Sequence, residues 1–259
     1  MPSWNPDQYL RFAEARTRPC RELAARIALA GPQRIVDLGC GPGNSTEVLA
    51  ERFPGAALSG IDSSPDMIAQ ARKSGAHAEW SVGDITGFAA ESAPPFDLVF
   101  SNAAFQWVLS HETLIPSLMR RVAKGGALAF QVPANREAPP HEAARQLAAS
   151  ARWRAQFPKP AREWDVRPPE VYYDLLAPLS GRVDLWFTDY IQVMPDAAAI
   201  VEWYKGSGLR PYLDALPDEA AHADFLADYG ALIAAAHPAR PDGRVLFPFR
   251  RMFCVAYRD

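Results

Sequence analysis

Cysteine is scarce in this chain, which also has no long apolar run and no excess of charge. The three cysteines among 259 residues lie far apart and in none of the paired spacings that bind metal ions. A formal net charge of −3 supplies no field that would gather a polyanion. No apolar run reaches the roughly 18 residues that span a bilayer, and residues 1–7 lack the basic and apolar regions of a secretory signal. We therefore expect a cytoplasmic protein that needs no metal and binds neither nucleic acid nor membrane.

The rest of the composition is that of a globular protein. With 49% hydrophobic and 22% charged residues, the chain can bury one large core, or one core and a cap. Small molecules are the expected partners, and nothing in the sequence predicts an oligomeric state.

Strand and helix patterns alternate through the first half of the chain. A short apolar run that ends in glycines predicts a strand buried on both faces at 33–38. Further strands are predicted at 57–62, 77–82, 96–101 and, after a turn at Gly125 and Gly126, 127–132. Apolar spacings of helical period predict helices at 45–53 and 111–123, and a serine followed by a proline opens another at 64–65. Two more helices are expected near the N-terminus, one from about Pro6 and one over 21–30. This alternation implies a parallel sheet with right-handed crossovers.

The strongest motif is a glycine-rich turn between the first predicted strand and the helix after it. Gly39, Gly41 and Gly43 allow positive φ angles and a close approach of the backbone to a ligand, and the next helix presents unpaired N–H groups. The motif predicts a site for a cofactor that contains adenosine. A tight strand-to-helix turn without a ligand is the structural alternative.

Three polar residues bear on which cofactor binds. Asp62 ends the second predicted strand and could bind a ribose diol in either a nicotinamide dinucleotide or S-adenosylmethionine. Asn44 stands where the dinucleotide pattern requires glycine or alanine. Asp37 precedes the glycines, where a carboxylate would repel a diphosphate but could hold the ammonium group of a methionyl moiety. The residues favour S-adenosylmethionine, and a nicotinamide-dependent oxidoreductase is the rival interpretation.

The ends of the third and fourth predicted strands supply further candidates. Asp84 could accept a hydrogen bond from an adenine amino group, and Ile85 could pack on the ring. Asn102 opens the segment that leaves the fourth strand, at the carboxyl edge where open α/β sheets bind ligands. Gln106 and Trp107 follow in the same segment and are candidates for the substrate, although Trp107 could equally belong to the core.

In this order, residues 36–43, Asp62, Asp84 and the segment from Asn102 resemble the motifs of the class I S-adenosylmethionine-dependent methyltransferases. The resemblance implies that Asp62 binds the ribose, with Ser63 beside it, and that Met67 packs on the adenine. Asp62 and Met67 each have a structural explanation as well, because Asp62 could cap the turn after it and Met67 occupies a core-facing helical position.

The second half of the chain fits the same fold class, an α/β protein with a doubly wound, Rossmann-like, seven-stranded mixed sheet and a helical cap. Residues 182–194 and 246–258 predict the sixth and seventh strands as an antiparallel pair. We expect a single domain whose core comprises 31–133, 182–194 and 246–259. The cap, expected to choose the substrate, would be formed by 1–30, 134–181 and 195–245.

A more particular resemblance extends along nearly the whole chain. The segments that carry it are residues 4–6, 16–19, 102–107, 111–112, 202–203, 206–211, 242–243 and 247–251, with Tyr9 and Phe12. They resemble the family of the trans-aconitate 2-methyltransferases. This resemblance implies methyl esterification of one carboxylate of trans-aconitate, or of a related small polycarboxylate, with S-adenosylhomocysteine as the second product.

The implied reaction needs no general base. A carboxylate acceptor is already ionised near neutral pH because its pKa is about 4, so we expect no catalytic proton-transfer residue. The carboxylates that do not react require paired donors, which arginine supplies best. Arg136 and Arg210 are expected in this role ahead of Arg244, Arg250 and Arg251. Each of these arginines could instead be a solvated surface residue.

Two other functions remain compatible with the motifs. One is a methyltransferase that acts on a phenolic hydroxyl or an amine, and the other is a sensor that binds S-adenosylmethionine without turnover. His111 is expected to belong to the start of a helix and not to the substrate site, and Trp203 and Tyr204 to the core.

Overall fold

The computed structural model describes residues 13–159 and 164–259, with side chains from residue 17 onward. The chain divides into two compact units, which we describe separately. The sheet unit contains the described residues up to Ala134, together with Asp165–Thr188 and Arg251–Asp259. The helical unit contains 135–159, 164 and 189–250.

A seven-stranded sheet has the order β3-β2-β1-β4-β5-β7-β6. Its strands are β1 (Arg34–Leu38), β2 (Ala57–Asp62), β3 (Ala78–Val82), β4 (Phe96–Asn102), β5 (Val122–Pro133), β6 (Ser180–Met194) and β7 (Val245–Arg258). Neighbours among β1 to β5 pair in parallel, and β7 pairs antiparallel with β5. The predicted mixed sheet of seven strands is thereby confirmed. The strand order reverses between β1 and β4, which is the point where open α/β sheets bind ligands.

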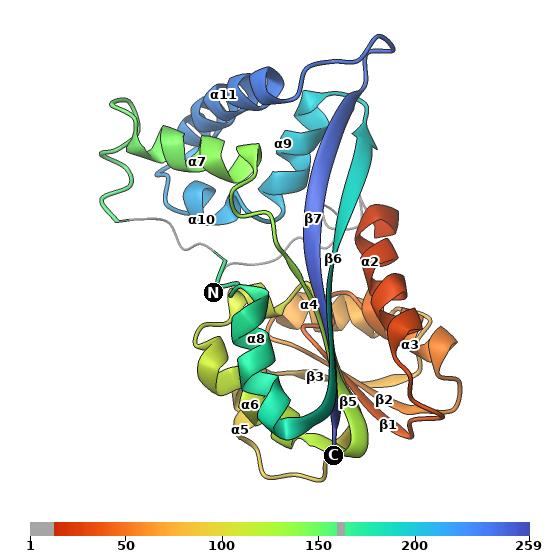
Figure 1. Ribbon diagram of the computed structural model, residues 1–259. Helices are drawn as coiled ribbons and strands as arrows, with labels where there is room; N and C mark the ends of the chain where they lie inside the picture. Colours follow the sequence, from red (N-terminus) through yellow and green to blue (C-terminus); the bar gives the residue numbers. More distant parts are fainter. Residues whose placement is uncertain (1–12, 160–163) are drawn as a thin grey trace. The chain divides into compact units, whose positions relative to one another are not determined.

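Helices cover both faces of the sheet in the sheet unit. They are α2 (Ala13–Arg26), α3 (Asn44–Arg52), α4 (Pro65–Ala71), α5 (Ile85–Ala90), α6 (His111–Arg120) and α8 (Pro169–Leu176), with the short 3₁₀ helices η1 (Phe105–Trp107) and η2 (Ala177–Leu179). Figure 1 shows α2 and α3 on one side of the strands and α5, α6 and α8 on the other. The predicted start of α4 is confirmed, because Ser64 caps it and Pro65 is its first residue.

The core of the sheet unit lies between the strands and the layer formed by α5, α6 and α8. Its completely buried members include Val36, Leu38, Val99, Leu128, Phe130, Val132, Ile115, Leu118 and Tyr172. Burying each apolar side chain of this size contributes roughly 1.5–3 kcal/mol. The continuous apolar runs that predicted β1, β4 and β5 reflect strands covered on both faces.

The helical unit is held together by aromatic side chains. It contains α7 (Pro139–Ala149), α9 (Ala197–Lys205), α10 (Arg210–Leu213) and α11 (Glu219–Ala236), and α11 packs against α7 and α9. Trp203 and Tyr204 are buried on α9 against Phe247, as predicted for core residues.

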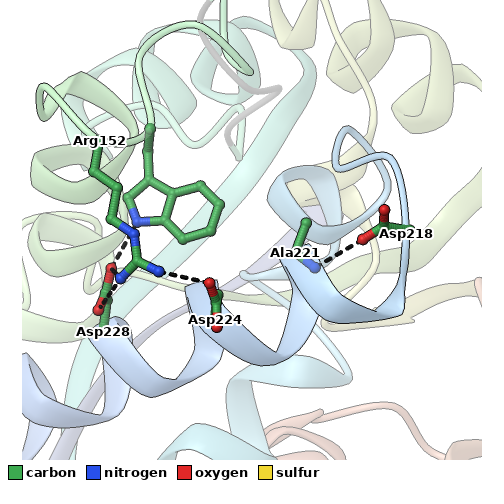
Figure 2. A network of polar contacts seen from close by, with 6 residues as sticks. Arg152, Asp218, Ala221, Asp224 and Asp228 are labelled. Atoms are coloured by element: carbon green, nitrogen blue, oxygen red, sulfur yellow. Dashed lines mark hydrogen bonds and ion pairs between the residues drawn. The ribbon is translucent and has the colours of Figure 1, made fainter.

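The surface of α11 carries polar contacts that tie it to the loop after α7. Arg152 contacts Asp224 at 2.6 Å and Asp228 at 2.8 Å, and Asp218 caps the first turn of α11 through the Ala221 N–H (Figure 2). The indole N–H of Trp153 donates to Asp228 as well. Exposed ion pairs contribute at most about 1 kcal/mol each, so the apolar contacts dominate.

The end of α6 and the start of β5 differ from the prediction by three residues or more. Helix α6 ends at Arg120 and β5 already begins at Val122, so that Gly125 and Gly126 lie within the strand and not before it. A Cβ atom at Gly126 would come within 2.5 Å of the Asp97 carbonyl oxygen, and the register of β4 with β5 shifts at this point. The glycines therefore accommodate a bulge, which sequence alone presents as a turn.

The N-terminal helices also differ from the expectation. A helix from about Pro6 falls outside the described residues, and the one expected over 21–30 is part of α2, which runs without a break through Pro19 and ends at Arg26. Cys20, Leu23 and Ala24 are buried, and α2 packs on α3 and β5. This packing outweighs the backbone hydrogen bond that proline removes.

The division into core and cap differs from the expectation in both directions. Residues 189–194 and 246–250 were expected in the core, but they belong to the helical unit. The described part of 1–30 and the residues from Asp165 to 181 were expected in the cap, but both belong to the sheet unit, where α2 contacts β5 and α8 contacts α6.

No helix among the described residues is both long and apolar enough to cross a membrane. The same part of the chain contains no group of three or more metal-binding side chains.

Candidate functional site

The glycine loop between β1 and α3 is held close to the end of β2. The N–H groups of Gly39 and Cys40 donate to the Ile61 carbonyl oxygen at 2.8 and 3.1 Å. Gly39 has a φ of +71°, and a Cβ atom there would lie 2.2 Å from that of Ala104. Gly41 has a φ of +55° but faces open space, with nothing within 4 Å of the position of a Cβ. The loop thus packs tightly on one side and leaves its backbone accessible at Gly41, as a ligand requires.

Gly43 ends this loop as the N-cap residue of α3, and no side chain caps that helix. The first N–H groups of α3 therefore lack a side-chain acceptor from the cap position.

Asp62, at the carboxyl end of β2, binds the backbone on both sides. Its Oδ2 accepts from the Gly41 N–H and its Oδ1 from the Ser64 N–H, both at 2.9 Å. Burial raises the pKa of this carboxyl group, and the two N–H donors oppose the rise. Asp62 therefore caps the turn after it, which was the structural alternative to a ribose role. The same carboxylate also fixes the position of the glycine loop. Ser63 is exposed beside it, and Met67 is buried on α4.

Asp37 is buried beneath the loop near the end of β1. Its Oδ2 accepts from the hydroxyls of Ser45 at 2.5 Å and Thr46 at 2.7 Å, whereas its Oδ1 is buried without a hydrogen-bond partner among the described residues. Burial raises the pKa of Asp37 to about 6, the two hydroxyls lower it, and the charge of Asp62 raises it further. Ser45 and Thr46 were not predicted as part of the site. Their position in the first turn after the glycines is the signal that could have identified them.

In the part of the chain that the structure describes, three more buried acceptors lack hydrogen-bond partners, one shortly after β1 and two at or just after the end of β4. They are Oδ1 of Asn44, Oδ1 of Asn102 and Oε1 of Gln106. A buried acceptor without a donor costs about 1–3 kcal/mol, so a ligand that brings N–H or O–H groups would be favoured here. The ammonium, amino and hydroxyl groups of S-adenosylmethionine fit this set together with Asp37. A diphosphate offers no donors and would face a carboxylate.

The third strand end contributes a carboxylate and an apolar side chain. Asp84 is exposed and caps α5, with its Oδ1 accepting from the Gly87 N–H at 2.8 Å. Ile85 is buried, and its Cδ1 lies 3.9 Å from the position of a Cβ atom at Gly39. The structure therefore places Ile85 beside the glycine loop and gives Asp84 a capping role that the sequence analysis did not consider.

The substrate candidates fall in different units. Gln106 and Trp107 lie in η1 of the sheet unit, where the Gln106 side chain donates to the Ala103 carbonyl oxygen at 2.6 Å and Trp107 is half-buried. Arg136 and Arg210 belong to the helical unit. Arg136 is exposed, and Arg210 begins α10 with its Nε 3.7 Å from Asp214. The Gln106 side chain and the Arg210 guanidinium therefore each contact a group within their own unit.

His111 is a structural residue. It is completely buried, with Nδ1 2.6 Å from the Tyr172 hydroxyl and Nε2 2.9 Å from the Phe105 carbonyl oxygen. With Nε2 protonated, both ring nitrogens are satisfied within the sheet unit, which agrees with the expectation that it does not bind substrate.

Comparisons with known proteins show which fold and family the chain has. A family model described as a methyltransferase domain matches residues 35–126, from β1 to the glycines of β5. Among solved structures, a phosphoethanolamine N-methyltransferase of Haemonchus contortus bound to S-adenosylhomocysteine matches 93% of this chain and 53% of its own, at a TM-score of 0.56 and 15% identity. A coclaurine N-methyltransferase matches 94% and 71% at a TM-score of 0.56 and 16% identity. These likenesses concern the fold, which is that of the class I S-adenosylmethionine-dependent methyltransferases.

Curated relatives define the family more narrowly. Proteins named trans-aconitate 2-methyltransferase from Azoarcus sp. and Paracidovorax citrulli are each 49% identical to this chain, over all of it and all of their own length. One from Rhodopseudomonas palustris is 45% identical over the same full extent. The chain belongs to the family of the trans-aconitate 2-methyltransferases.

Proposed function

We propose that this chain transfers a methyl group from S-adenosylmethionine to one carboxylate of trans-aconitate, giving the monomethyl ester and S-adenosylhomocysteine. The observation that carries the proposal is the set of buried acceptors around the glycine loop, centred on the Asp37 carboxylate, which matches a donor-rich, cationic nucleoside. The similarity to trans-aconitate 2-methyltransferases along the full chain supports the choice of acceptor.

The cofactor site that we propose is built from the first three strand ends and from the end of β4. Its residues are Asp37, Gly39, Gly41, Gly43, Asp62, Ser63, Met67, Asp84, Ile85 and Asn102. In this arrangement, Asp37 attracts the ammonium group, Asp62 accepts from the ribose hydroxyls, and Ile85 provides an apolar surface for the adenine. The accessible backbone at Gly41 supports a close approach of the ligand.

When bound, the cofactor supplies an electrophilic methyl group on a sulfonium. The acceptor carboxylate is ionised at neutral pH because its pKa is about 4, so the protein needs no general base, and we propose no catalytic residue in that sense. The task of the side chains is to bind, orient and exclude water. Gln106, Trp107, Arg136 and Arg210 are proposed to bind the acceptor, the arginines through its carboxylates.

A cytoplasmic location and the absence of a nucleic-acid partner belong to the same proposal. Cys20, Cys40 and Cys254 are buried free thiols, which is consistent with a reducing compartment.

The test is methyl transfer to trans-aconitate, measured beside a panel of other di- and tricarboxylates, phenols and amines. The expected product is an ester heavier by one methylene, formed together with S-adenosylhomocysteine. Calorimetry with S-adenosylhomocysteine and with a nicotinamide dinucleotide tests the cofactor separately. Turnover of a phenol or amine in place of trans-aconitate would contradict the acceptor, and binding of the dinucleotide alone would contradict the cofactor.

A further inference from the structure

A buried arginine and a buried glutamine form a pair at the carboxyl edge of the sheet. Arg251 on β7 is only 5% exposed, and its Nη1 lies 3.0 Å from Oε1 of Gln131 on β5, which is completely buried. Arg136, by contrast, is exposed, and Arg210 lies near the carboxylate of Asp214. A guanidinium removed from water acts on a ligand charge with much less screening than one at the surface.

The register of the strands places this pair beside the end of β4. Gln131 lies opposite Asn102 on β4 and opposite Phe253 on β7. Arg251 precedes Phe253 by two residues, so its side chain leaves the same face of the sheet as those of Gln131 and Asn102. The three side chains therefore form a row across β4, β5 and β7 at the edge that carries the cofactor site.

The pair retains a donor, on Gln131, that no group among the described residues accepts from. Nε2 of Gln131 is buried without a hydrogen-bond partner, while Oε1 of the same amide is occupied by Arg251. An amide N–H that is anchored next to a guanidinium presents donors and a positive charge side by side, which is the arrangement that binds a carboxylate. A buried donor of this kind is costly to leave unsatisfied.

The neighbouring contacts connect the row to the glycine loop and close it on one side. The Ala103 N–H donates to the Gln131 carbonyl oxygen at 2.9 Å, and Ala104, the next residue, is the one that packs against Gly39. At the other end, Trp186 stacks on Phe253 with ring centroids 4.9 Å apart. A ligand group bound at the row would thus lie next to the cofactor and be shielded from solvent by aromatic side chains.

We propose that Arg251 and Gln131 form a carboxylate-binding subsite of this enzyme. The identity of the ligand at this subsite rests on the proposed function, whose two reactants each carry a carboxylate that could occupy it. One is a carboxylate of the acceptor that does not react, and the other is the carboxylate at the methionyl end of the cofactor. Both use the same chemistry, a fork of guanidinium and amide donors on a carboxylate.

Gln131→Glu is the sharpest test, because it changes little in size but places a carboxylate on Arg251 that competes with that of the ligand. Arg251→Lys keeps the charge and removes the fork. Arg182→Gln is the matched control, since Arg182 on β6 belongs to the same unit, is exposed, and has its Nη2 3.8 Å from Oδ2 of Asp184. Thermal unfolding establishes that each variant is folded.

Three calorimetric titrations on each protein distinguish the two sources. They use S-adenosylhomocysteine, 5′-methylthioadenosine, which lacks the methionyl carboxylate, and trans-aconitate added to the S-adenosylhomocysteine complex. If the acceptor occupies the subsite, trans-aconitate binds at least about 10-fold more weakly to both variants, and S-adenosylhomocysteine is unaffected. If the cofactor occupies it, S-adenosylhomocysteine loses affinity by the same factor and methylthioadenosine does not.

The subsite is refuted if folded Gln131→Glu and Arg251→Lys bind S-adenosylhomocysteine and trans-aconitate within about twofold of the wild type, as the Arg182→Gln control should. Failure of the proposed function has a different signature, because the wild-type enzyme itself would then neither bind nor methylate trans-aconitate. In that event the titrations with S-adenosylhomocysteine and methylthioadenosine alone decide whether the subsite exists.

Discussion

Lowering the pH from 8 to 5 should weaken the binding of S-adenosylhomocysteine about tenfold through the protonation of Asp37. Burial raises the pKa of this carboxyl group to about 6, against the effect of the Ser45 and Thr46 hydroxyls and with a contribution from Asp62. Only the ionised form attracts the ammonium group of the ligand. At pH 5 about one molecule in ten carries the ionised form, and the apparent Kd rises by the inverse of that fraction.

The same carboxyl group also makes the stability of the ligand-free protein depend on pH. Because the pKa of Asp37 is higher in the folded protein than its usual 3.8, folding favours the protonated form. The stabilisation is therefore complete below pH 3.8 and is lost as the pH rises through about 6, by about 3 kcal/mol in total. Asp37→Asn should accordingly raise the stability of the ligand-free protein at pH 8, by at most this amount, while it weakens ligand binding.

Calorimetric titration of S-adenosylhomocysteine at pH 5, 6, 7 and 8 measures the first effect, and urea unfolding measures the second. Asp174→Asn, which removes an exposed carboxylate from α8, is the control and should keep the pH dependence of the wild type. The reasoning is refuted if the wild-type Kd is the same at pH 5 and pH 8, or if Asp37→Asn retains the full pH dependence.

Three further results are expected. Asp62→Ala should weaken S-adenosylhomocysteine binding about 100-fold, because charge-assisted hydrogen bonds to the ribose are lost. An unchanged Kd would rule out the ribose role of Asp62. Gly39→Ala should lower the free energy of unfolding by more than about 3 kcal/mol and Gly41→Ala by only about 1–2 kcal/mol, because Ala104 blocks a side chain only at Gly39. Equal decreases for the two variants in urea unfolding would contradict this packing of the loop. His111→Gln should lower the free energy of unfolding by about 1–3 kcal/mol and leave the KM values for cofactor and acceptor within about twofold of the wild type, because the His111 ring contacts Tyr172 and the Phe105 carbonyl. A selective rise in the KM for the acceptor would assign His111 to the substrate site.

Asp62 and Asp84 show how site residues also build the scaffold. Asp62 holds the Gly41 and Ser64 N–H groups, and Asp84 caps α5. The sequence predicted both positions because Asp62 ends a strand and Asp84 lies just after the next one. Only the contacts revealed that these carboxylates already accept from backbone N–H groups. A ligand bound there would therefore share each carboxylate with the backbone.

Strands β1 to β4 were predictable within one residue at each end. For β1 and β4 the reason is that buried strands have a local signature, an apolar run that stops at glycine or a polar residue. The start of β5 was not, since Gly125 and Gly126 look like a turn locally. Their role depends on the Asp97 carbonyl of the neighbouring strand, which the local sequence does not contain.

By itself the sequence determined the alternation of strands and helices, the glycine loop and the acids at the strand ends, all of which depend on residues that are neighbours along the chain. The tertiary structure alone decided which polar atoms are buried without a partner, and that Arg251 meets Gln131 across 120 positions of sequence. The physical reason is that burial and pairing depend on segments that only folding brings together, whereas turn geometry and strand length depend on local sterics.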